Sequence, residues 1–566
     1  MIRKSIRKDL LEAIKDLNFE FNNNFSVEIP KKAGQGDYST NIAMVSSKLN
    51  KMKPRELAEK IKKQISKKRK YKKIEVAGPG FINFTIANTV YRSTLLNIYE
   101  QGEDYGNSDH GKSKKVLLEF VSANPTGPLN IVSARAAAYG DTLYRIMNKV
   151  GYEAKREFYV NDAGNQIDIL AESIELRYRE LLGEDIGEFP VEAYHGEYVI
   201  EMAEILKARV GTKLVHMSAK DRLDKIKRFA LKELNNMQIE SLEKFDVEFD
   251  NWFSEKGLRE EGLVEGVLSY LAEAGCTYEQ EEAIWFASTK FGDVKDRVLM
   301  KSDGEFTYFV PDIAYHITKY ERGYDIIIDV LGPDHHGYVP RLKAAIKALN
   351  LDESKLEIIF LQQVNLFNKE EKIKMSKRAG KIIRMEQLIK ETGKDAARFF
   401  FLDRKPSAHL NFDLELAKKK SNENPVYYCQ YAHARISSIM RKAKKSKINL
   451  KKFDKKYLKR LKSDEEMLLI KKLTKFPSVL NDAADYREPH RVANYVMELA
   501  SEFHKYYQKA KIINPKYKEL SMARLFLAKN VQSVIRLALN VMGINAPQRM
   551  KSTKTKTNKN KKEKKK

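Results

Sequence analysis

Residues 116–140 constrain the fold of this chain more than any other segment, because they pass from an apolar strand through a Gly/Pro turn into an alanine-rich helix start. The strand is predicted over Val116–Val121, and the turn contains Asn-Pro-Thr-Gly-Pro. The first turn of a helix carries backbone N–H groups without partners, and these groups attract an anion. A strand, a tight turn and a helix in this order are typical of a parallel α/β sheet with an anion-binding edge.

A second segment, Lys-Ile-Lys-Met-Ser-Lys-Arg-Ala-Gly at 372–380, places lysines on a short loop. Lys374 and Lys377 can neutralise the charge that builds on phosphoryl oxygens during attack, and Ser376 can donate a hydrogen bond. Met375 is expected to anchor the loop. Alone, such a loop could also be a solvated basic turn in a lysine-rich chain. Together with the first segment, it predicts a site that holds a triphosphate while its inner phosphorus is attacked.

The length of 566 residues is too great for one hydrophobic core, so we expect about three or four domains. The two cysteines, Cys276 and Cys429, lie far apart, which suits a reducing compartment and excludes a cysteine-based zinc site. No apolar run reaches the roughly 18 residues that span a bilayer, and the N-terminus lacks the apolar core of a signal peptide. We therefore expect a cytoplasmic protein without a membrane partner.

The net charge is +27, from 104 basic and 77 acidic residues. The tail 551–566 holds nine lysines and one glutamate, and subtracting its +8 leaves +19 on the rest of the chain. Such an excess suits a polyanionic partner, since phosphate contacts release counterions, although a general bias toward lysine explains the charge equally well. The tail is expected to be disordered.

The order of apolar patterns predicts an α/β protein with a Rossmann-like parallel-sheet domain. This domain is expected to carry a mostly helical insertion, to follow an N-terminal α+β domain and to precede an all-α bundle. The predicted boundaries are 1–107 for the N-terminal domain, 108–415 for the sheet domain with its insertion at about 166–280, 416–548 for the bundle and 549–566 for the tail.

The expected elements follow from apolar runs and helical spacing. After the first strand, sheet strands are predicted at Glu157–Val160, Asp296–Met300, Phe306–Val310, Asp325–Leu331 and Glu357–Phe360. Helices are predicted at Met1–Leu17, Pro54–Lys68, Val90–Gln101, Ala219–Leu242, Leu468–Leu480 and Ala523–Val541.

The segment Gly106–Ser113 matches the phosphate-loop pattern G-x-x-x-x-G-K-S. That loop binds phosphate only where a strand precedes it and a helix follows it. Here the predicted helix Val90–Gln101 precedes and the strand Val116–Val121 follows, so the order is reversed. We interpret this segment as a linker.

Four segments resemble the arginyl-tRNA synthetase family, a branch of the class I aminoacyl-tRNA synthetases. They are Phe120–Pro128, Tyr159–Gln166, Met375–Gly380 and Glu423–Ile436, and the similarity runs from about residue 30 to about residue 546. The resemblance implies ATP-dependent activation of L-arginine to arginyl-adenylate and transfer to the 3′ end of tRNA(Arg). It also implies Mg²⁺ bound with ATP, a first step that often needs bound tRNA, and a monomer. In this family the N-terminal domain meets the corner of the tRNA.

The sequence departs from the family where His-x-Gly-His is usual, because Asn130-Ile-Val-Ser133 stands there. Both imidazoles are missing, and Asn130 and Ser133 offer only neutral donors. A lost donor in such a site typically costs a few kcal/mol of transition-state binding. This departure leaves an alternative open: a catalytically decayed synthetase paralogue that acts as a tRNA-binding protein.

The resemblance also assigns the arginine site. Tyr308 and Asp312 are expected to hold the guanidinium group, while Ser122 and Asn124 are expected to contact the amino-acid backbone, with Asp162 as a weaker candidate. Simple capping of the next helix is the alternative for Tyr308 and Asp312. A synthetase for another amino acid is disfavoured, because a small apolar substrate would not suit the Asp312 carboxylate.

The remaining candidates bind the nucleotide and the RNA. Asp334-His-His-Gly follows a predicted strand, but no further His or Cys cluster completes a metal site, so we predict no metal site and favour an edge of the nucleotide pocket. The predicted ATP-binding residues are Pro128, Asp334, His335, His336 and Met375. The predicted tRNA-binding residues are Tyr427, Gln430, Tyr431, His433 and Arg435, each of which could also serve packing alone.

Overall fold

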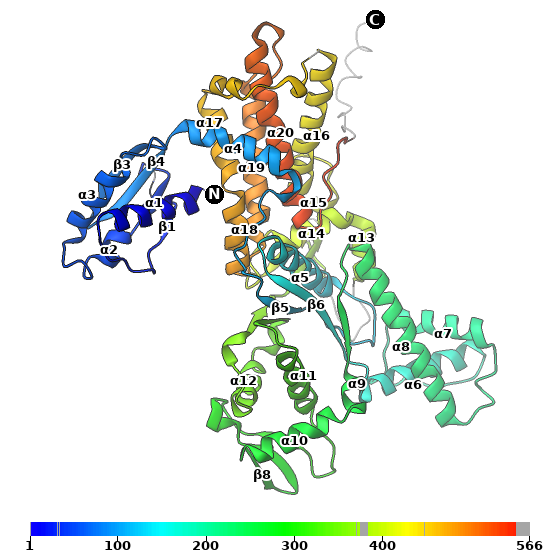
Figure 1. Ribbon diagram of the computed structural model, residues 1–566. Helices are drawn as coiled ribbons and strands as arrows, with labels where there is room; N and C mark the ends of the chain where they lie inside the picture. Colours follow the sequence, from blue (N-terminus) through cyan, green and yellow to red (C-terminus); the bar gives the residue numbers. More distant parts are fainter. Residues whose placement is uncertain are drawn as a thin grey trace, which may run out of the picture.

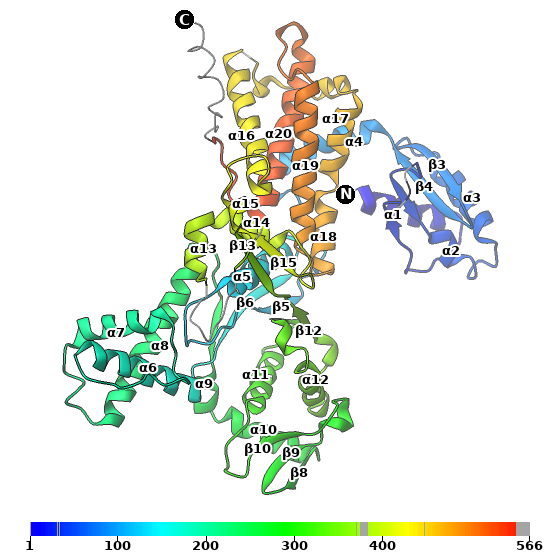
Figure 2. The same ribbon diagram turned by 180° about the vertical axis from the view of Figure 1, so that it is seen from behind.

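The computed structural model of this chain describes residues 2–30, 32, 34–368, 371–373, 383–446 and 448–550. Figures 1 and 2 show an elongated molecule with a long helical bundle at one end, a sheet in the middle and two smaller units beyond the sheet. The N-terminal unit lies beside the bundle. Lys374, Met375, Ser376 and Lys377 lie outside the described residues, and so does the chain from residue 551 onward.

A five-stranded parallel sheet forms the centre, with the strand order β12-β11-β5-β6-β7. Its strands are β5 (Lys115–Glu119), β6 (Glu153–Val160), β7 (Asn251–Ser254), β11 (Ile326–Leu331) and β12 (Leu356–Phe360). The chain passes from β5 to β6 on one side and returns as β11 on the other. The crevice at the carboxyl ends of β5 and β11 is therefore where sheets of this kind bind ligands. The predicted parallel α/β core and four of its predicted strands are confirmed.

Helix α5 (Ile131–Lys149) follows β5 and packs closely on the sheet. A Cβ atom added at Gly140 would lie 2.2 Å from the ring of Phe120, so only glycine permits this approach. The helix ends just before Gly151, whose φ of +89° continues the chain into β6. This close packing fixes the start of α5 at the carboxyl edge of β5.

The insertion after β6 is helical only in part. Its helices are α6 (Asn165–Leu181), α7 (Glu197–Val210) and α8 (Ala219–Lys244), and they share a core of their own that includes Ile174, Met202 and Leu234. The chain then returns to the central sheet as β7, which pairs with β6. The predicted insertion of 166–280 is thus divided by a sheet strand.

A second inserted unit follows β7. It contains α9 (Glu255–Glu260), α10 (Leu263–Glu273) and a three-stranded sheet of β8 (Thr277–Gln280), β9 (Ala283–Phe286) and β10 (Arg297–Met300). Helix α11 (Phe309–Glu321) leads from it to β11, and α12 (Val339–Ala348) connects β11 to β12 and packs on both strands.

Two predicted strands of the parallel sheet are wrong. The Asp296–Met300 prediction falls on β10, which pairs antiparallel with β9 outside the central sheet. The Phe306–Val310 prediction falls on an isolated bridge at Phe306 and on the start of α11. A five-residue run with four aromatic or apolar members suits a strand or a buried helix start equally well, and here the buried positions 309, 310, 313 and 314 have helical spacing.

The N-terminal unit is an α+β layer. Its antiparallel sheet has the order β1-β2-β4-β3, and α1 and α3 confirm the two predicted helices. The elements are α1 (Ile2–Asp16), β1 (Val27–Glu28), β2 (Tyr38–Thr40), α2 (Ile42–Ser46), α3 (Pro54–Ile65), β3 (Tyr71–Ala77) and β4 (Phe81–Ile86). Helix α4 (Asn88–Gln101) then packs along the bundle, and the linker after it leads into β5, so the reversed order around Gly106–Ser113 is confirmed.

The C-terminal bundle is entirely helical. It consists of α16 (Pro425–Lys445), α17 (Asp464–Thr474), α18 (Phe476–Asp485), α19 (His490–Lys509) and α20 (Lys518–Val541). The predicted helix Leu468–Leu480 is wrong as one element, because the chain breaks at Lys475 and α18 restarts with a proline in its first turn. No helix in the described part of the chain combines the length and apolarity needed to cross a membrane.

A short connecting region joins the sheet to the bundle. It contains β13 (Val364–Asn368), β14 (Glu371–Lys372), α13 (Met385–Thr392), α14 (Lys394–Leu402), β15 (Leu410–Asp413) and α15 (Leu414–Lys418). One apolar core runs through this region, the bundle, the N-terminal unit and α5, whereas the inserted units have separate cores.

Arg487, between α18 and α19, ties the bundle to the sheet. Its guanidinium group donates to both carboxylate oxygens of Glu357 in β12, each at 2.9 Å. Its carbonyl oxygen accepts a hydrogen bond of 2.6 Å from the Tyr139 hydroxyl of α5. The left-handed backbone at Arg487, with φ of +54°, directs both groups toward the sheet.

Candidate active site

The turn after β5 is strained. Val121 and Ser122 both have left-handed φ values, +70° and +37°, which non-glycine residues and β-branched ones above all avoid. The Ser122 hydroxyl donates to Glu119 Oε1 at 2.8 Å and accepts from the backbone N–H of Tyr159 at 3.1 Å. These bonds hold Ser122 between the ends of β5 and β6.

Asn130 is the N-cap of α5. Its side-chain oxygen accepts hydrogen bonds from the backbone N–H groups of Val132 (2.8 Å) and Ser133 (3.2 Å). Two of the N–H groups that were expected to face an anion are therefore capped in this arrangement. The Asn130 amide N–H₂ group is the donor that remains at this position, and the side chain of Val132 faces outward with 41% of its surface exposed.

The chain that follows the lysine motif returns to Asn130. Arg384 forms a β-bridge with Asn130, and the backbone N–H of Met385 donates to the carbonyl of Leu129 at 2.8 Å. The Arg384 guanidinium also pairs with both carboxylate oxygens of Glu201 in α7, each at 2.9 Å. Since Lys374 and Lys377 lie outside the described residues, their approach to Asn130 stays a prediction.

The helical insertion supports the turn that contains Asn124 and Pro128. Gln238 of α8 donates to the carbonyls of Asn124 (3.1 Å) and Gly127 (2.9 Å), and the Asn124 side chain donates to Gln166 at 2.7 Å. The Tyr198 hydroxyl of α7 donates to the carbonyl of Thr126 at 2.7 Å. The turn is thus braced by α6, α7 and α8.

The Asp162 carboxylate is engaged at the start of α9. It accepts from the hydroxyl of Ser254 at 2.7 Å and from the backbone N–H of Lys256 at 2.8 Å. Each of its two oxygens thus already accepts one hydrogen bond at the helix start. The predicted contact of Asp162 with arginine stays a prediction.

Tyr308 and Asp312 lie in the first turn of α11, at the carboxyl edge of the sheet. Tyr308 makes no side-chain capping bond, and 69% of its surface is exposed. The Tyr338 hydroxyl donates to Asp312 Oδ2 at 2.6 Å, and 28% of the Asp312 side chain is exposed. Asp312 thus presents part of a fixed carboxylate to solvent, as a guanidinium site requires.

Behind Asp312 runs a chain of buried charged groups. His316 Nδ1 lies 3.3 Å from Asp312 Oδ1 and 2.7 Å from the Asp312 carbonyl, and its Nε2 lies 2.9 Å from Asp329 Oδ2. The Lys319 ammonium, fully buried, contacts Asp329 Oδ1 at 2.7 Å and Glu119 Oε2 at 2.5 Å. We call Glu119, Asp312, His316, Lys319 and Asp329 the buried charge network.

The network sets the protonation of its members. Burial and the nearby Lys319 act to lower the pKa of His316, but Asp312 and Asp329 outweigh them and raise it to about 10. Burial acts to raise the pKa of Asp312, but His316 and the Tyr338 hydroxyl hold it below its ordinary value. His316 is therefore an imidazolium and Asp312 a carboxylate at neutral pH.

Four members of the network were missed from the sequence. Glu119 and Asp329 are single carboxylates within apolar strands, and His316 and Lys319 follow Asp312 at helical spacing, one and two turns along α11. A single carboxylate within an apolar strand is a pattern from which Glu119 and Asp329 could have been selected as candidates. Their contact through Lys319 could not have been predicted, because it depends on the register in which β5 pairs with β11.

Asp334, His335 and His336 lie at the same edge, directly after β11. Residues Pro333–His335 form a short 3₁₀ turn, and the His336 ring stacks on Phe360 of β12 at 3.7 Å between ring centres. All three predicted nucleotide contacts are exposed. Among the described residues, no group of three carboxylate, His or Cys side chains is arranged to hold a metal ion.

The predicted RNA-binding residues on α16 fall into two groups. Tyr427 stacks on Tyr431 at 6.1 Å, and Arg435 lies over the Tyr431 ring at 4.5 Å, so these half-buried groups form an aromatic face. Gln430 and His433 are buried and bond the carbonyls of Asn545 (2.8 Å) and Pro547 (2.9 Å). Gln430 and His433 fix the segment 545–547 against α16. Their contacts with RNA stay predictions.

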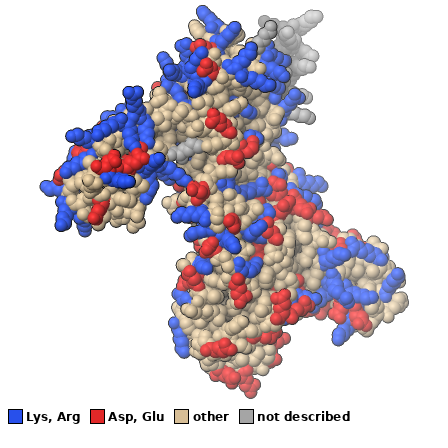
Figure 3. All heavy atoms as spheres, in the orientation of Figure 1, with Lys and Arg blue, Asp and Glu red and all other residues tan. Residues whose placement is uncertain are grey.

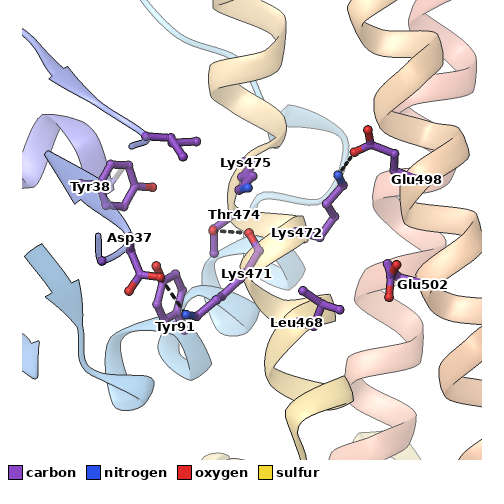
Figure 4. Close-up of a pocket in the computed structure, with 12 residues that line it drawn as sticks. Asp37, Tyr38, Tyr91, Leu468, Lys471, Lys472, Thr474, Lys475, Glu498 and Glu502 are labelled. Atoms are coloured by element: carbon purple, nitrogen blue, oxygen red, sulfur yellow. Dashed lines mark hydrogen bonds and ion pairs between the residues drawn. The ribbon is translucent and has the colours of Figure 1, made fainter. Parts of the chain in front are cut away.

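Basic side chains gather on part of the surface. Figure 3 shows Lys and Arg over the N-terminal unit and the end of the bundle that lies away from the sheet, while Asp and Glu gather around the second inserted unit. A cleft of about 330 Å³ separates the N-terminal unit from α17 and α19, and Figure 4 shows Asp37 in it, paired with Lys471 at 2.7 Å. The basic units therefore contact each other.

Three family models match successive parts of the chain between residues 4 and 550. The arginyl tRNA synthetase N terminal domain matches residues 4–86, the catalytic domain of class I (R) tRNA synthetases matches residues 94–438, and the DALR anticodon binding domain matches residues 429–550. The catalytic-domain match alone spans more than half of the chain.

Similar proteins and solved structures indicate the same family as these three matches. "Arginine--tRNA ligase 1" of Halalkalibacterium halodurans is 45% identical over 97% of this chain and 99% of that protein, and "Arginine--tRNA ligase" of Listeria monocytogenes is 46% identical over 93% and 94%. A candidate arginyl-tRNA synthetase of Campylobacter jejuni has a TM-score of 0.76 at 35% identity, covering 82% of this chain and 100% of that chain. The Thermus thermophilus arginyl-tRNA synthetase shares the fold, with a TM-score of 0.74 at 19% identity over 97% and 100%. The chain therefore belongs to the arginyl-tRNA synthetase family of class I aminoacyl-tRNA synthetases.

Proposed function

We propose that this protein is an arginine–tRNA ligase. It activates L-arginine with ATP to arginyl-adenylate and then transfers the arginyl group to the 3′ end of tRNA(Arg). The observation that carries the proposal is the partly exposed Asp312 carboxylate at the carboxyl edge of the sheet, backed by the buried charge network. The near full-length similarity to named arginine–tRNA ligases supports it independently.

In the first step, Asp312 and Tyr308 bind the guanidinium group of arginine. Ser122 and Asn124 orient its amino and carboxylate groups, with Asp162 nearby. The attacking carboxylate oxygen meets the α-phosphate, and pyrophosphate leaves. The support for this assignment is the common position of these residues at the carboxyl ends of β5, β6 and β11.

The triphosphate is held between the start of α5 and the lysine motif. Asn130 and Ser133 provide neutral donors, while Lys374, Lys377 and Ser376 provide the charge and the hydroxyl that stabilise the leaving pyrophosphate. Mg²⁺ enters with ATP as the counter-ion of its phosphates. Pro128, Met375 and the 334–336 turn contact the rest of the nucleotide. The bridge between Arg384 and Asn130 supports this arrangement, because it brings the chain after the motif to the start of α5.

In the second step, the terminal ribose of tRNA attacks the adenylate. The N-terminal unit meets the corner of the tRNA and the bundle binds the anticodon stem, with Tyr427, Tyr431 and Arg435 offering stacking surfaces and Gln430 and His433 close by. The basic surface of both units supports this docking. We further propose a monomer that works in the cytoplasm, where aminoacyl-tRNA is used for protein synthesis.

A pyrophosphate-release assay tests the function. With arginine, ATP and tRNA(Arg) present, the protein should release pyrophosphate, and omission of arginine should abolish the release. Tight tRNA binding without turnover would instead support the decayed, RNA-binding paralogue that the missing imidazoles suggest. The near full-length similarity to named arginine–tRNA ligases favours the enzyme.

A further inference from the structure

Asp312 is held by a relay of contacts and not by one neighbour. His316 lies between two carboxylates: its Nδ1 faces Asp312 and its Nε2 faces Asp329 at 2.9 Å. Asp329 is fixed in turn by Lys319 at 2.7 Å, and Lys319 is fixed by Glu119. Only 5% of the His316 side chain and 3% of the Asp329 side chain are exposed, so neither contacts solvent or a ligand to any extent.

The surroundings of His316 leave its orientation no freedom. Charged and titratable groups face it from three elements: Asp312, Tyr315 and Lys319 of α11, Asp329 of β11 and Glu119 of β5. Its ring packs edge-on against Tyr315 at 5.6 Å, and its Nδ1 also contacts the Asp312 carbonyl one turn earlier in the helix. Because the imidazole contacts both carboxylates, the position of Asp329 determines the position of the ring and, through it, that of the Asp312 carboxylate.

We propose that Asp329 and His316 are positioning residues for arginine: through His316, Asp329 fixes the orientation of the Asp312 carboxylate that receives the guanidinium cation. This inference rests on the proposed function and deepens it. Asp329 also adds a negative charge behind the pocket, which favours a monocation over an uncharged ligand of the same shape. The pocket therefore selects against citrulline, the neutral isostere of arginine, by charge as well as by hydrogen bonding.

Removal of either residue should disturb the same relay. In Asp329→Asn the network loses a negative charge, so a cationic ligand binds less tightly. In His316→Gln the Asp312 carboxylate loses its cationic neighbour while Asp329 keeps Lys319, so burial raises the pKa of Asp312 and it takes up a proton more readily. The second variant thus gains no negative charge and loses the orientation of Asp312.

Steady-state pyrophosphate release, with tRNA(Arg) saturating, tests the inference. Both variants should raise KM for arginine about tenfold or more, with kcat and KM for ATP changed less than about threefold. The ratio of kcat/KM for arginine over citrulline should fall by a similar factor. KM for arginine in the double variant should be no higher than in the more impaired of the two single variants, because both substitutions break the same relay. Asp325→Asn is the matched control: Asp325 precedes β11 at its opposite end, where it bonds only the backbone N–H of Lys115 at 2.8 Å.

The outcomes separate the two proposals. If the wild-type protein releases no pyrophosphate with arginine, the proposed function is overturned and this inference falls with it. If the wild type is active but His316→Gln keeps the wild-type KM for arginine, the relay alone is refuted. KM values for arginine and ATP that rise together, or effects of the two substitutions that add, would also refute it, since they indicate general damage to the fold. If Asp329→Asn does not fold, His316→Gln and its arginine-to-citrulline ratio decide the question.

Discussion

Glu119 and Asp329 lie directly opposite each other in the neighbouring parallel strands β5 and β11. Two carboxylates at paired positions of a buried sheet repel each other unless a cation lies between them. Lys319 of α11 supplies that cation and contacts one oxygen of each. The register of the sheet therefore determines which side chain α11 must carry at this position.

Replacement of Lys319 by methionine should destabilise the sheet domain strongly. The two carboxylates would lose their buried partner, a change that typically costs about 3–5 kcal/mol. The shift of the urea midpoint, followed by tryptophan fluorescence, measures the loss. Lys301→Met is the matched control, because Lys301 pairs with Glu305 on the surface, where solvent screens the pair, and its replacement should shift the midpoint little. Equal shifts for the two variants would contradict the prediction.

The charge of His316 should make stability depend on pH. Its pKa is raised to about 10 in the folded protein, so its stabilising charge is fully present below the ordinary histidine value of about 6.5 and is lost as the pH rises toward 10. The difference in unfolding free energy between wild type and His316→Gln should shrink over this window, by up to about 1.4 kcal/mol per pH unit. Denaturant titrations at pH 6, 8 and 9.5 measure it. Parallel pH curves for the two proteins would show that His316 carries no such charge.

Tyr338→Phe should weaken arginine binding. The Tyr338 hydroxyl donates a 2.6 Å hydrogen bond to Asp312, and a bond to a charged group is typically worth about 1.5–3 kcal/mol. KM for arginine should therefore rise by roughly tenfold or more, while KM for ATP stays unchanged. Tyr320→Phe provides the comparison, since the Tyr320 hydroxyl bonds only the carbonyl of Asp352. A Tyr338→Phe enzyme with an unchanged KM for arginine would place the guanidinium elsewhere.

Lys377→Ala should suppress adenylate formation while leaving tRNA affinity nearly unchanged. Loss of one group that stabilises the transition state typically costs a factor of about 100 to 1,000 in rate. Single-turnover adenylate formation and filter binding of tRNA measure the two effects separately. Lys390→Ala, in the exposed part of α13, should leave both unchanged. A Lys377→Ala protein that forms the adenylate at the normal rate would mean that the motif does not act on the phosphates.

Local patterns predicted the elements whose sequence suits one structure only. The apolar run of β11 and the amphipathic α20 were found because their length or spacing has a single interpretation. Phe306–Val310 was misassigned because so short a run of mainly aromatic and apolar residues does not distinguish a strand from a helix start. The break at Lys475 was missed because the apolar spacing continues across it.

The sequence predicted candidate site residues that belong to a recognisable local segment. It did not predict residues that contact each other only in the tertiary structure. Asp312 was predicted from the family resemblance and stays a prediction, whereas Glu119, Lys319 and Asp329 come together only through strand register. The capping of α5 by the Asn130 oxygen was not predicted, although an asparagine before a helix commonly satisfies the nearest backbone N–H groups, and the role of the Asn130 amide as a donor stays a prediction.

The contact of Arg487 with Glu357 and Tyr139 makes the turn between α18 and α19 a strut between the helical bundle and the central sheet. A ligand that tilts the bundle must either carry β12 and α5 along with it or break the strut. While the strut holds, a tilt of the bundle displaces β12 together with the middle of α5, where Tyr139 lies.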